Sequence, residues 1–494
     1  MRRALGGLVG LLCMALGSRA GWAQAPEDPP PHYQADFPPE EWKARWERVY
    51  DAIGDQAAAL IQGAPMVRGF VLPRQANEFY YLCGVETPHS YLLLDGRTRK
   101  ATLFLPPRNA RLERSEGRVL SAADVELAKS LTGVAEVLST DALRGEGLAA
   151  LPGGLPPVLF TPFQPAEGWA ESRYEIQQAN GAIASDPFDG RLPREGQLVQ
   201  LLRARHPRTE VRDLTPALDT LRAVKSPREI ALIRRASELA GLGILEAMRS
   251  TRPGLVEYQL EAAARYLFQT GGARMDGYRA IAGAGAPNIW NAHYYRNDAT
   301  LRDGDMVLVD FAPDYHYYTS DVTRMWPVNG RFSPVQRELL SFVLAYRNAV
   351  LKRIKAGVTA EEILLAAKTE MEEVLGRTRF SKPVYEAAAR KLVASGGGVL
   401  SHPVGMAVHD DGPYNLGPLR PGHVFSIDPQ LWVPEEKLYY RYEDVIVVTE
   451  TGYTNFTDFL PTELDAIEKE IKKGGLLQKV PPPAGTASSS SAIK

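Results

Sequence analysis

Cysteine is almost absent from this sequence, which contains two among its 494 residues. Cys13 lies in an N-terminal apolar run, so loss of that run would leave Cys83 alone and no intrachain disulfide could form. Cys83 lies in the aromatic, strand-like run Glu78–Gly84, a setting that favours a buried structural thiol over a reactive nucleophile. A fold held by disulfides and a cysteine-based catalyst are both disfavoured.

The sequence also lacks a strong charge of either sign. Its formal net charge of -2 gives no electrostatic reason to expect a nucleic acid as a partner. Hydrophobic residues make up 45% and charged residues 23%, which is typical of a soluble globular protein. The chain is too long for one ordinary core, so we expect two domains.

The N-terminal apolar run, Ala4–Leu16, is too short to span a bilayer. Arg2 and Arg3 precede it, and the small residues Gly21 and Ala23 follow it. This pattern predicts a secretory signal peptide over residues 1–23. We therefore expect an exported protein, periplasmic or secreted, without membrane association after cleavage. The paired arginines suggest twin-arginine export, but their flanking residues do not support that route.

The rest of the chain is expected to comprise a Pro-rich linker, two domains and a disordered tail, with bounds 24–39, 40–215, 223–465 and 478–494. The N-terminal domain should mix strands and helices. Its β-favouring runs are 66–72, 78–82, 90–94, 101–105 and 157–160, and its helical segments are 122–131 and 141–150. The tail is rich in Pro, Ser and Ala and cannot bury enough apolar surface to become ordered.

The C-terminal domain should begin with a helix at Pro227, with Ser226 as its N-cap and Glu229 in its first turn. A weak internal repeat follows, in which residues 254–264 resemble residues 357–367. Each copy is a Gly turn, a cap and an Ala-rich helix. The repeat predicts that this domain consists of two related halves.

Two aspartates follow in an arrangement that indicates a shared site. Asp310 ends the apolar strand 305–310, and Asp321 lies after a short aromatic segment that can fold back as a hairpin. Carboxylates gathered in a partly buried place repel one another and remain partly protonated unless a cation compensates them. A pair of metal ions would resolve that conflict.

Further candidate ligands lie in the last hundred residues of this domain. His402 and His409 lie on what we expect to be an apolar, glycine-punctuated strand. Asp428 ends another apolar strand, and Glu443 directly precedes a third. An oxygen-rich, nitrogen-poor ligand set of this kind suits two divalent ions, with Mn²⁺ favoured and Co²⁺ or Zn²⁺ as alternatives.

The order and spacing of these residues resemble the pita-bread metallopeptidases, and within them Xaa-Pro aminopeptidase (aminopeptidase P) and prolidase. The matching motifs are Lys225–Ile230, the Asp310/Asp321 pair, Ser401–Asp410 and Arg441–Asp444. Residues 79–84 and 90–107 resemble the creatinase-like N-terminal domain of the same enzymes. The resemblance covers nearly all of residues 40–465. It implies an α/β (α+β) fold, in which a creatinase-like N-terminal domain precedes a pita-bread catalytic domain with pseudo-two-fold halves.

The resemblance implies a metal-dependent exopeptidase that hydrolyses the N-terminal Xaa-Pro bond of a peptide substrate with a hydroxide activated by two metal ions. The implied ligands are Asp310, Asp321, His402, Asp428 and Glu443. Asp428 would also accept the proton of the attacking water. His293 and His409 would contact the substrate, and Arg441 would support the ligands. Relatives also imply a homo-oligomer, either a dimer or a tetramer.

Two positions depart from the family's pattern. Asp428 stands where the family has Glu, so its carboxylate reaches about 1.3 Å less far, which is large beside the tolerance of about 0.2 Å for metal-ligand distances. Gly398 stands where relatives carry a histidine of the pocket for proline. An Xaa-Pro dipeptidase, and a diverged non-peptidase member of the fold comparable to metal-free creatinase, therefore stay open as alternatives.

Overall fold

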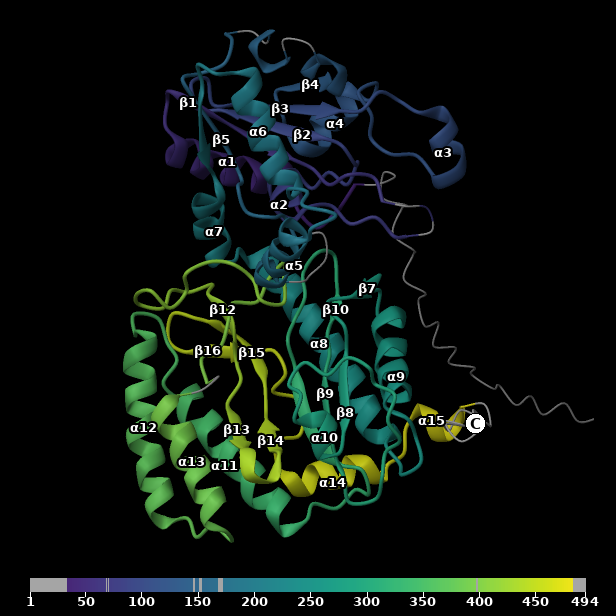
Figure 1. Ribbon diagram of the computed structural model, residues 1–494, viewed down its shortest axis with the longest axis vertical. Helices are drawn as coiled ribbons and strands as arrows, with labels where there is room; N and C mark the ends of the chain where they lie inside the picture. The colour runs from purple at the N-terminus through teal and green to yellow at the C-terminus, as the bar shows by residue number, and fades with distance from the viewer. Residues whose placement is uncertain are drawn as a thin grey trace, which may run out of the picture.

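The computed structural model of this protein describes residues 33–482, apart from residues 68, 70, 145–146, 151–152, 168–171 and 397–398. The predicted signal peptide, most of the predicted linker, Gly398 and the end of the predicted tail lie outside the described residues. The chain forms two domains, one above the other in Figure 1, and helices α5 (Arg173–Ser185) and α7 (Thr215–Ala223) lie where they meet. No helix in the described ranges is long and apolar enough to cross a membrane.

The N-terminal domain is built on a six-stranded mixed sheet with the strand order β4-β3-β2-β1-β5-β6. Its strands are β1 (Ala57–Gln62), β2 (Tyr91–Asp95), β3 (Lys100–Leu105), β4 (Glu136–Ser139), β5 (Val158–Thr161) and β6 (Glu210–Asp213). Its other described α-helices are α1 (Pro39–Ile53), α2 (Asn77–Cys83), α3 (Ala110–Glu116), α4 (Val125–Thr132) and α6 (Arg194–Arg205). The strands expected at 90–94, 101–105 and 157–160 and the helix expected at 122–131 are confirmed.

Three local expectations for this domain are wrong. The run 78–82 lies in helix α2, in which all seven residues are buried. Packing on every side overrides the β preference of its aromatic residues. The described residues of 66–72 form no strand, and 141–150 contains two short 3₁₀ helices, η1 (Thr140–Leu143) and η2 (Gly147–Ala150), instead of one α-helix. Cys83 is fully buried, as predicted.

The C-terminal domain places two antiparallel sheets side by side, with the strand orders β11-β9-β8 and β12-β15-β16. These strands are β8 (Ile281–Ala284), β9 (Met306–Asp310), β11 (Thr323–Pro327), β12 (Val424–Ile427), β15 (Asp444–Val448) and β16 (Tyr453–Asn455). A hairpin of β13 (Gln430–Val433) and β14 (Leu438–Arg441) and a short pair of β7 (Met275–Asp276) and β10 (Pro313–Asp314) complete the strands described here.

Helices cover the outside of this domain. Helices α8 (Pro227–Ser250) and α9 (Glu257–Thr270) lie beside the first sheet, and α11 (Pro334–Leu351), α12 (Ala360–Arg377) and α13 (Pro383–Ser395) lie on the other flank (Figure 1). Helix α8 begins at Pro227 with a Ser226/Glu229 capping box, as predicted. The remaining helices are α10 (Ala286–Ile289), η3 (Pro434–Glu436), α14 (Leu464–Lys472) and α15 (Leu476–Lys479). Because α15 bonds to α8 through Gln478 Nε2 and Ser250 O, 2.8 Å apart, ordered structure extends past the predicted tail boundary.

The two related halves are visible in matching backbone hydrogen bonds. Gly254 N donates to Leu301 O at 2.9 Å, and Gly357 N donates to Leu419 O at 2.8 Å. Both glycines have a positive φ, 89° and 82°, which glycine adopts without strain. Each half then continues into an inner strand that leads to an aspartate, Asp310 in one and Asp428 in the other. The predicted repeat is therefore a repeat of structure.

Asp444 joins the inner strands to the surrounding helices through a buried ion-pair network. Its carboxylate accepts from Arg324 Nη2 at 2.6 Å and from Arg347 Nε at 2.5 Å. Burial alone would raise the pKa of Asp444, but the two guanidinium groups outweigh burial and hold this pKa well below its usual range. The carboxylate therefore stays ionised in the folded protein.

Replacing Asp444 with Asn should destabilise the protein by about 3–5 kcal/mol, because two buried guanidinium groups would lose their counter-charge. The folded pKa lies below the unfolded value of about 3.9, so this contribution is present above that pH and is lost as the pH falls. Urea unfolding at pH 7 and at acidic pH measures both effects. Asp458→Asn, at an exposed position nearby, is the control, and an equal effect of the two substitutions would contradict the prediction.

Candidate metal centre

Strand pairing brings the predicted acidic residues together. Strand β9 ends at Asp310, whose partner in the antiparallel register is Thr323 at the start of β11. The connection between them folds back, as predicted, and places Asp321 beside Asp310. Strand β15 pairs with β12, so that Glu443 comes next to the end of β12. Glu443 N donates to Thr323 O at 3.2 Å, which joins the two halves at this point.

His402 reaches the same place from an irregular segment, and the strand expected at 398–410 is wrong for its described residues. Individual backbone hydrogen bonds attach this segment to β12, without the regular ladder of a paired strand. Ser426 N donates to His402 O at 2.9 Å, and Val404 N donates to Val424 O at 3.1 Å. The irregular backbone lets His402 face the carboxylates, whereas the strict alternation of a strand would fix which side chains face them.

Among the described residues, one guanidinium group, that of Arg441, lies between the acidic side chains. Arg441 Nη1 is 2.9 Å from Asp310 Oδ2, Arg441 Nε is 3.0 Å from Asp428 Oδ1, and Nη2 also contacts Glu443. Oxygens of Asp310, Asp321 and Glu443 lie within 4.8 Å of one another. Four buried carboxylates thus share one nearby positive charge, which leaves a deficit of positive charge in the site.

The pKa values reflect this deficit. Burial raises the pKa of Glu443 to about 8 and that of Asp428 to about 6, although Arg441 opposes both shifts. Burial, followed by the neighbouring carboxylates, raises the pKa of Asp321 well above its ordinary value. Burial lowers the pKa of His402 to about 3, and a neighbouring imidazole acts in the same direction. His402 is therefore neutral, which is the protonation state of a metal ligand.

The donor atoms themselves fit a cation. Glu443 Oε1 is buried without a hydrogen-bond partner among the described residues. In the tautomer in which His402 Nδ1 donates to Pro403 O, 3.1 Å away, the lone pair is on Nε2. Nε2 then lies 3.2 Å from Asp321 Oδ2, another acceptor, and 3.4 Å from the Ser426 hydroxyl. Two acceptors facing each other in a buried place are compatible once a cation lies between them.

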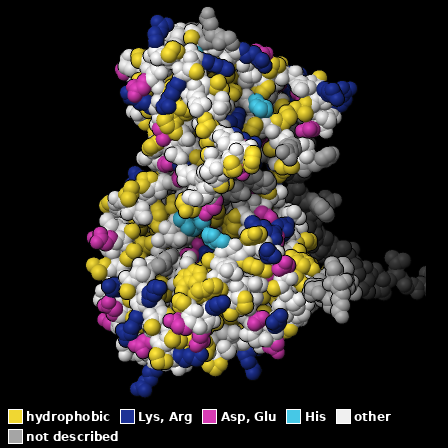
Figure 2. Space-filling model, in the orientation of Figure 1, with side chains coloured by type: hydrophobic (Ala, Val, Ile, Leu, Met, Phe, Trp, Pro, Cys, Tyr) yellow, Lys and Arg dark blue, Asp and Glu magenta, His cyan; other side chains and the backbone are white. Residues whose placement is uncertain are grey.

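A cavity of about 630 Å³ opens in front of these groups. Of the residues that line it, Asp310, Asp321 and Arg441 are buried, whereas His409 is half-buried and His293 is exposed. Figure 2 shows histidine side chains reaching the surface of the hollow between the two domains. The structure therefore brings all eight predicted site residues to one cavity or to its immediate wall, and their chemical roles remain predictions.

Two residues of this site have no signal in the sequence. The hydroxyl of Tyr278 donates to Asp310 Oδ1 at 2.6 Å and lies 3.1 Å from Asp321 Oδ1. Glu175, on helix α5 of the N-terminal domain, lies 3.9 Å from His409 Nδ1. Tyr278 follows a glycine in an otherwise unremarkable segment, and Glu175 is more than two hundred residues before its partner. Only the folded chain brings them to the site.

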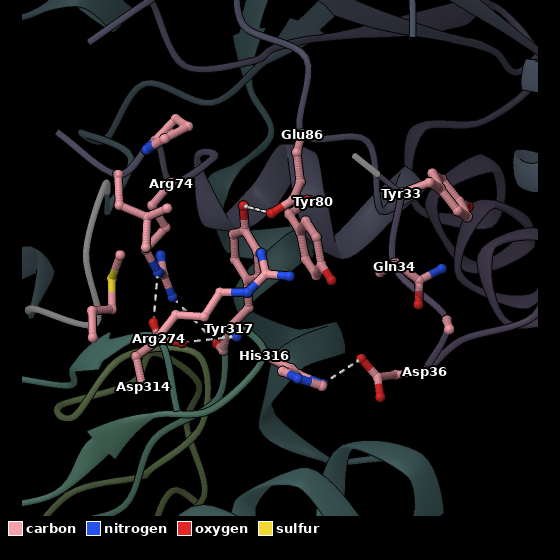
Figure 3. Close-up of a pocket in the computed structure, with 14 residues that line it drawn as sticks. Tyr33, Gln34, Asp36, Arg74, Tyr80, Glu86, Arg274, Asp314, His316 and Tyr317 are labelled. Carbon is pink, nitrogen blue, oxygen red and sulfur yellow. Dashed lines mark hydrogen bonds and ion pairs between the residues drawn. The ribbon is translucent and has the colours of Figure 1, made fainter. Parts of the chain in front are cut away.

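The N-terminal domain also holds the connection between Asp310 and Asp321. Tyr317, in that connection, stacks on Tyr80 with ring centroids 3.5 Å apart, and its hydroxyl donates to Glu86 Oε1 at 3.0 Å (Figure 3). Arg74 lies over the Tyr317 ring, 4.6 Å from its centroid. Tyr317 has a φ of 73°, which is strained for any residue with a side chain. The contacts with the other domain thus hold a strained backbone four residues before Asp321.

Known proteins resemble the chain along both domains. A family model described as metallopeptidase family M24 matches residues 231–450, and one described as aminopeptidase P, N-terminal domain, matches residues 42–151. Xaa-Pro aminopeptidase of Escherichia coli (strain K12) is 31% identical over 460 residues, which are 88% of this chain and 98% of the relative. Xaa-Pro aminopeptidase of Haemophilus influenzae is 30% identical, with the same two coverages. The structure of aminopeptidase P from E. coli with the inhibitor Pro-Leu has a TM-score of 0.71 at 27% identity, covering 89% of this chain and 99% of that chain.

The strain at Tyr317 predicts an unusual order of stability among variants. Tyr317→Ala and Tyr317→Gly both lose the stacked ring, but Gly adopts the positive φ without strain. The Gly variant should therefore be more stable than the Ala variant by about 1 kcal/mol, measured by urea unfolding. Tyr266, exposed on helix α9, is the matched control, because Gly should there be less stable than Ala by about 1 kcal/mol. The same order at both positions would show that Tyr317 is not strained.

Proposed function

The chain belongs to metallopeptidase family M24, and from this premise we propose that it removes the N-terminal residue from peptides whose second residue is proline. The observation that carries the proposal is the set of buried carboxylates, with a neutral histidine, that lies beside the cavity between the two domains. Its charge deficit, and the acceptor atoms that face one another there, suit the metal pair of a metallopeptidase. The Xaa-Pro specificity is supported by the names of the relatives that match both domains.

The proposed chemistry divides between the ions and the side chains. The predicted ligands Asp310, Asp321, His402, Asp428 and Glu443 would hold two divalent ions. When bound, these ions would lower the pKa of a coordinated water and polarise the scissile carbonyl. Tyr278 holds two of the carboxylates in place through its hydroxyl. His293, an exposed residue of the cavity lining, can donate a hydrogen bond to charge that develops on the peptide in the transition state. Asp428 can accept a proton and return it to the leaving nitrogen.

Three finer points belong to the same proposal. Mn²⁺ is favoured because carboxylate oxygens dominate the ligand set, with Co²⁺ and Zn²⁺ as alternatives. Export to the periplasm or medium is supported by the signal-peptide pattern in residues 1–23. A homo-oligomer, either a dimer or a tetramer, is supported by analogy with relatives. Mass spectrometry of the mature N-terminus and light scattering of the purified protein test the last two points.

Glu443→Gln should lower kcat/KM on an Xaa-Pro peptide at least ~100-fold, because the substitution removes a charged ligand at the centre of the carboxylate set. The free energy of unfolding in the presence of a chelator should change much less, since Gln fills the same volume. Steady-state hydrolysis with added Mn²⁺ and urea unfolding measure the two effects. Glu450→Gln, at an exposed position, is the matched control. Full activity of Glu443→Gln would remove this residue from the site.

A panel of peptides separates the proposed activity from its alternatives. Chelated protein reloaded with Mn²⁺, Co²⁺ or Zn²⁺ should cleave Xaa-Pro-Xaa peptides of three or more residues faster than the matching Xaa-Pro dipeptide. Replacement of proline by alanine should lower kcat/KM. Faster cleavage of the dipeptide would indicate a prolidase-like dipeptidase. A protein that binds less than one equivalent of metal and leaves every peptide intact would be a non-peptidase member of the fold.

A further inference from the structure

A second cavity, of about 220 Å³, lies between the two domains and is separate from the cavity of the metal centre (Figure 3). We call it the Tyr80 pocket. The N-terminal domain contributes Tyr80 and Glu86 to its lining, and the C-terminal domain contributes Arg274, Met275 and Tyr317. Among the described residues, none lines both cavities. At ~30 Å³ per water molecule the pocket has room for roughly seven waters, which suits one free amino acid and is too small for a tripeptide.

One cation and one anion of the Tyr80 pocket lack a partner of opposite charge. Arg274 is exposed and forms no hydrogen bond or ion pair with any described residue. Glu86 is half-buried and accepts from the Tyr317 hydroxyl at 3.0 Å, but it forms no ion pair within the described ranges. The two groups therefore line one pocket without pairing with each other. The other titratable groups of the lining have partners, Arg74 with Asp314 at 2.7 Å and His316 with Asp36 at 2.9 Å.

A buried hydroxyl group adds a hydrogen-bond donor to the pocket. Tyr80 is 2% exposed, and its hydroxyl has no hydrogen-bond partner in the part of the chain that the structure describes. Burial, followed by the neighbouring Tyr317 and Glu86, raises the pKa of Tyr80 well above its ordinary value, so the hydroxyl keeps its proton. Buried polar groups are nearly always hydrogen-bonded. The partner of this hydroxyl must therefore come from the contents of the pocket.

These groups match the chemistry of a free α-amino acid, which carries a carboxylate and an ammonium group on one carbon atom. The carboxylate can accept from the Arg274 guanidinium and the Tyr80 hydroxyl. The ammonium group can donate to the Glu86 carboxylate. An apolar side chain would lie against Leu72 and Met275, which also line the pocket. A zwitterion compensates both unpaired charges at once, whereas a simple anion or a simple cation compensates only one.

We propose that the Tyr80 pocket binds a free amino acid with an apolar side chain, through Arg274 and Tyr80 at the carboxylate and Glu86 at the ammonium group. The proposed exopeptidase releases one amino acid at each turnover, so the view of this ligand as a reaction product rests on the proposed function. The binding chemistry does not. The ligand would contact both domains, and it would contact Tyr317 in the connection between Asp310 and Asp321.

Calorimetry of the full-length, chelated protein tests the site, because removal of metal ions keeps peptide hydrolysis out of the measurement. The three probes are L-leucine, N-acetyl-L-leucine, which lacks the ammonium group, and L-leucinamide, which lacks the carboxylate. The wild type should bind leucine at least ~10-fold more tightly than either derivative, because each derivative loses one charge-assisted contact. Leucine should also raise the free energy of unfolding in urea as its concentration passes the Kd measured by calorimetry.

Variants assign each contact to its residue. In Arg274→Gln, the preference for leucine over leucinamide should fall at least ~10-fold, whereas in Glu86→Gln the preference for leucine over N-acetyl-leucine should fall by as much. The new amide of Glu86→Gln can still accept from Tyr317. Tyr80→Phe keeps the stacked ring and should weaken leucine binding at least ~3-fold. Arg331→Gln, at an exposed position outside the pocket lining, is the matched control and should bind leucine as the wild type does.

Two results would overturn the proposal: a wild type that does not bind leucine, and Arg274→Gln and Glu86→Gln variants that bind the three probes as the wild type does. Urea unfolding without leucine confirms that each variant is folded. Hydrolysis of Xaa-Pro peptides is measured separately with added Mn²⁺. Leucine binding in the expected pattern without hydrolysis would refute the proposed function and leave the pocket assignment standing. Hydrolysis without leucine binding would refute the pocket assignment alone.

Discussion

Burial of four carboxylates around one guanidinium group is the constraint on which the C-terminal domain depends. Ionised carboxylates lose much of their hydration in the interior, and each needs a compensating charge or a proton. Arg441 contacts three of the four acids and cannot neutralise them all. The raised pKa values of Asp321, Asp428 and Glu443 express this shortage. Divalent cations would supply the missing charge, and their binding energy would then be part of the folding energy.

The N-terminal domain acts on this centre at two separate points. Helix α5 brings Glu175 to the edge of the cavity, next to His409. Tyr80 and Arg74 hold Tyr317 in the connection between Asp310 and Asp321. Buried apolar residues of both domains also pack into one continuous core that includes Tyr317. The N-terminal domain thus contributes to the geometry of the site, in addition to covering the cavity.

The sequence predicts the parts of the site that strand patterns determine. Asp310 and Asp428 end apolar runs, and Glu443 precedes one, so their positions follow from alternation and strand length. The predicted strand around His402 is wrong because backbone bonds to β12 hold that segment in an irregular path. Helix α2 is missed because burial on all sides outweighs the β preference of its aromatic residues. Tyr278 and Glu175 reach the site through long-range packing, which no local pattern encodes.

Glu443 and Asp444 show how one strand serves both stability and chemistry. The two acids are adjacent in sequence, so at the start of β15 their side chains point to opposite faces. Asp444 meets two guanidinium groups, which keep it ionised and make it a structural anchor. Glu443 shares Arg441 with two other acids and keeps one oxygen without a hydrogen-bond partner among the described residues. The negative charge of Asp444 is therefore fully balanced on the face that packs against the helices. The negative charge of Glu443, on the face toward the cavity, is balanced only in part, and a metal ion can supply the rest.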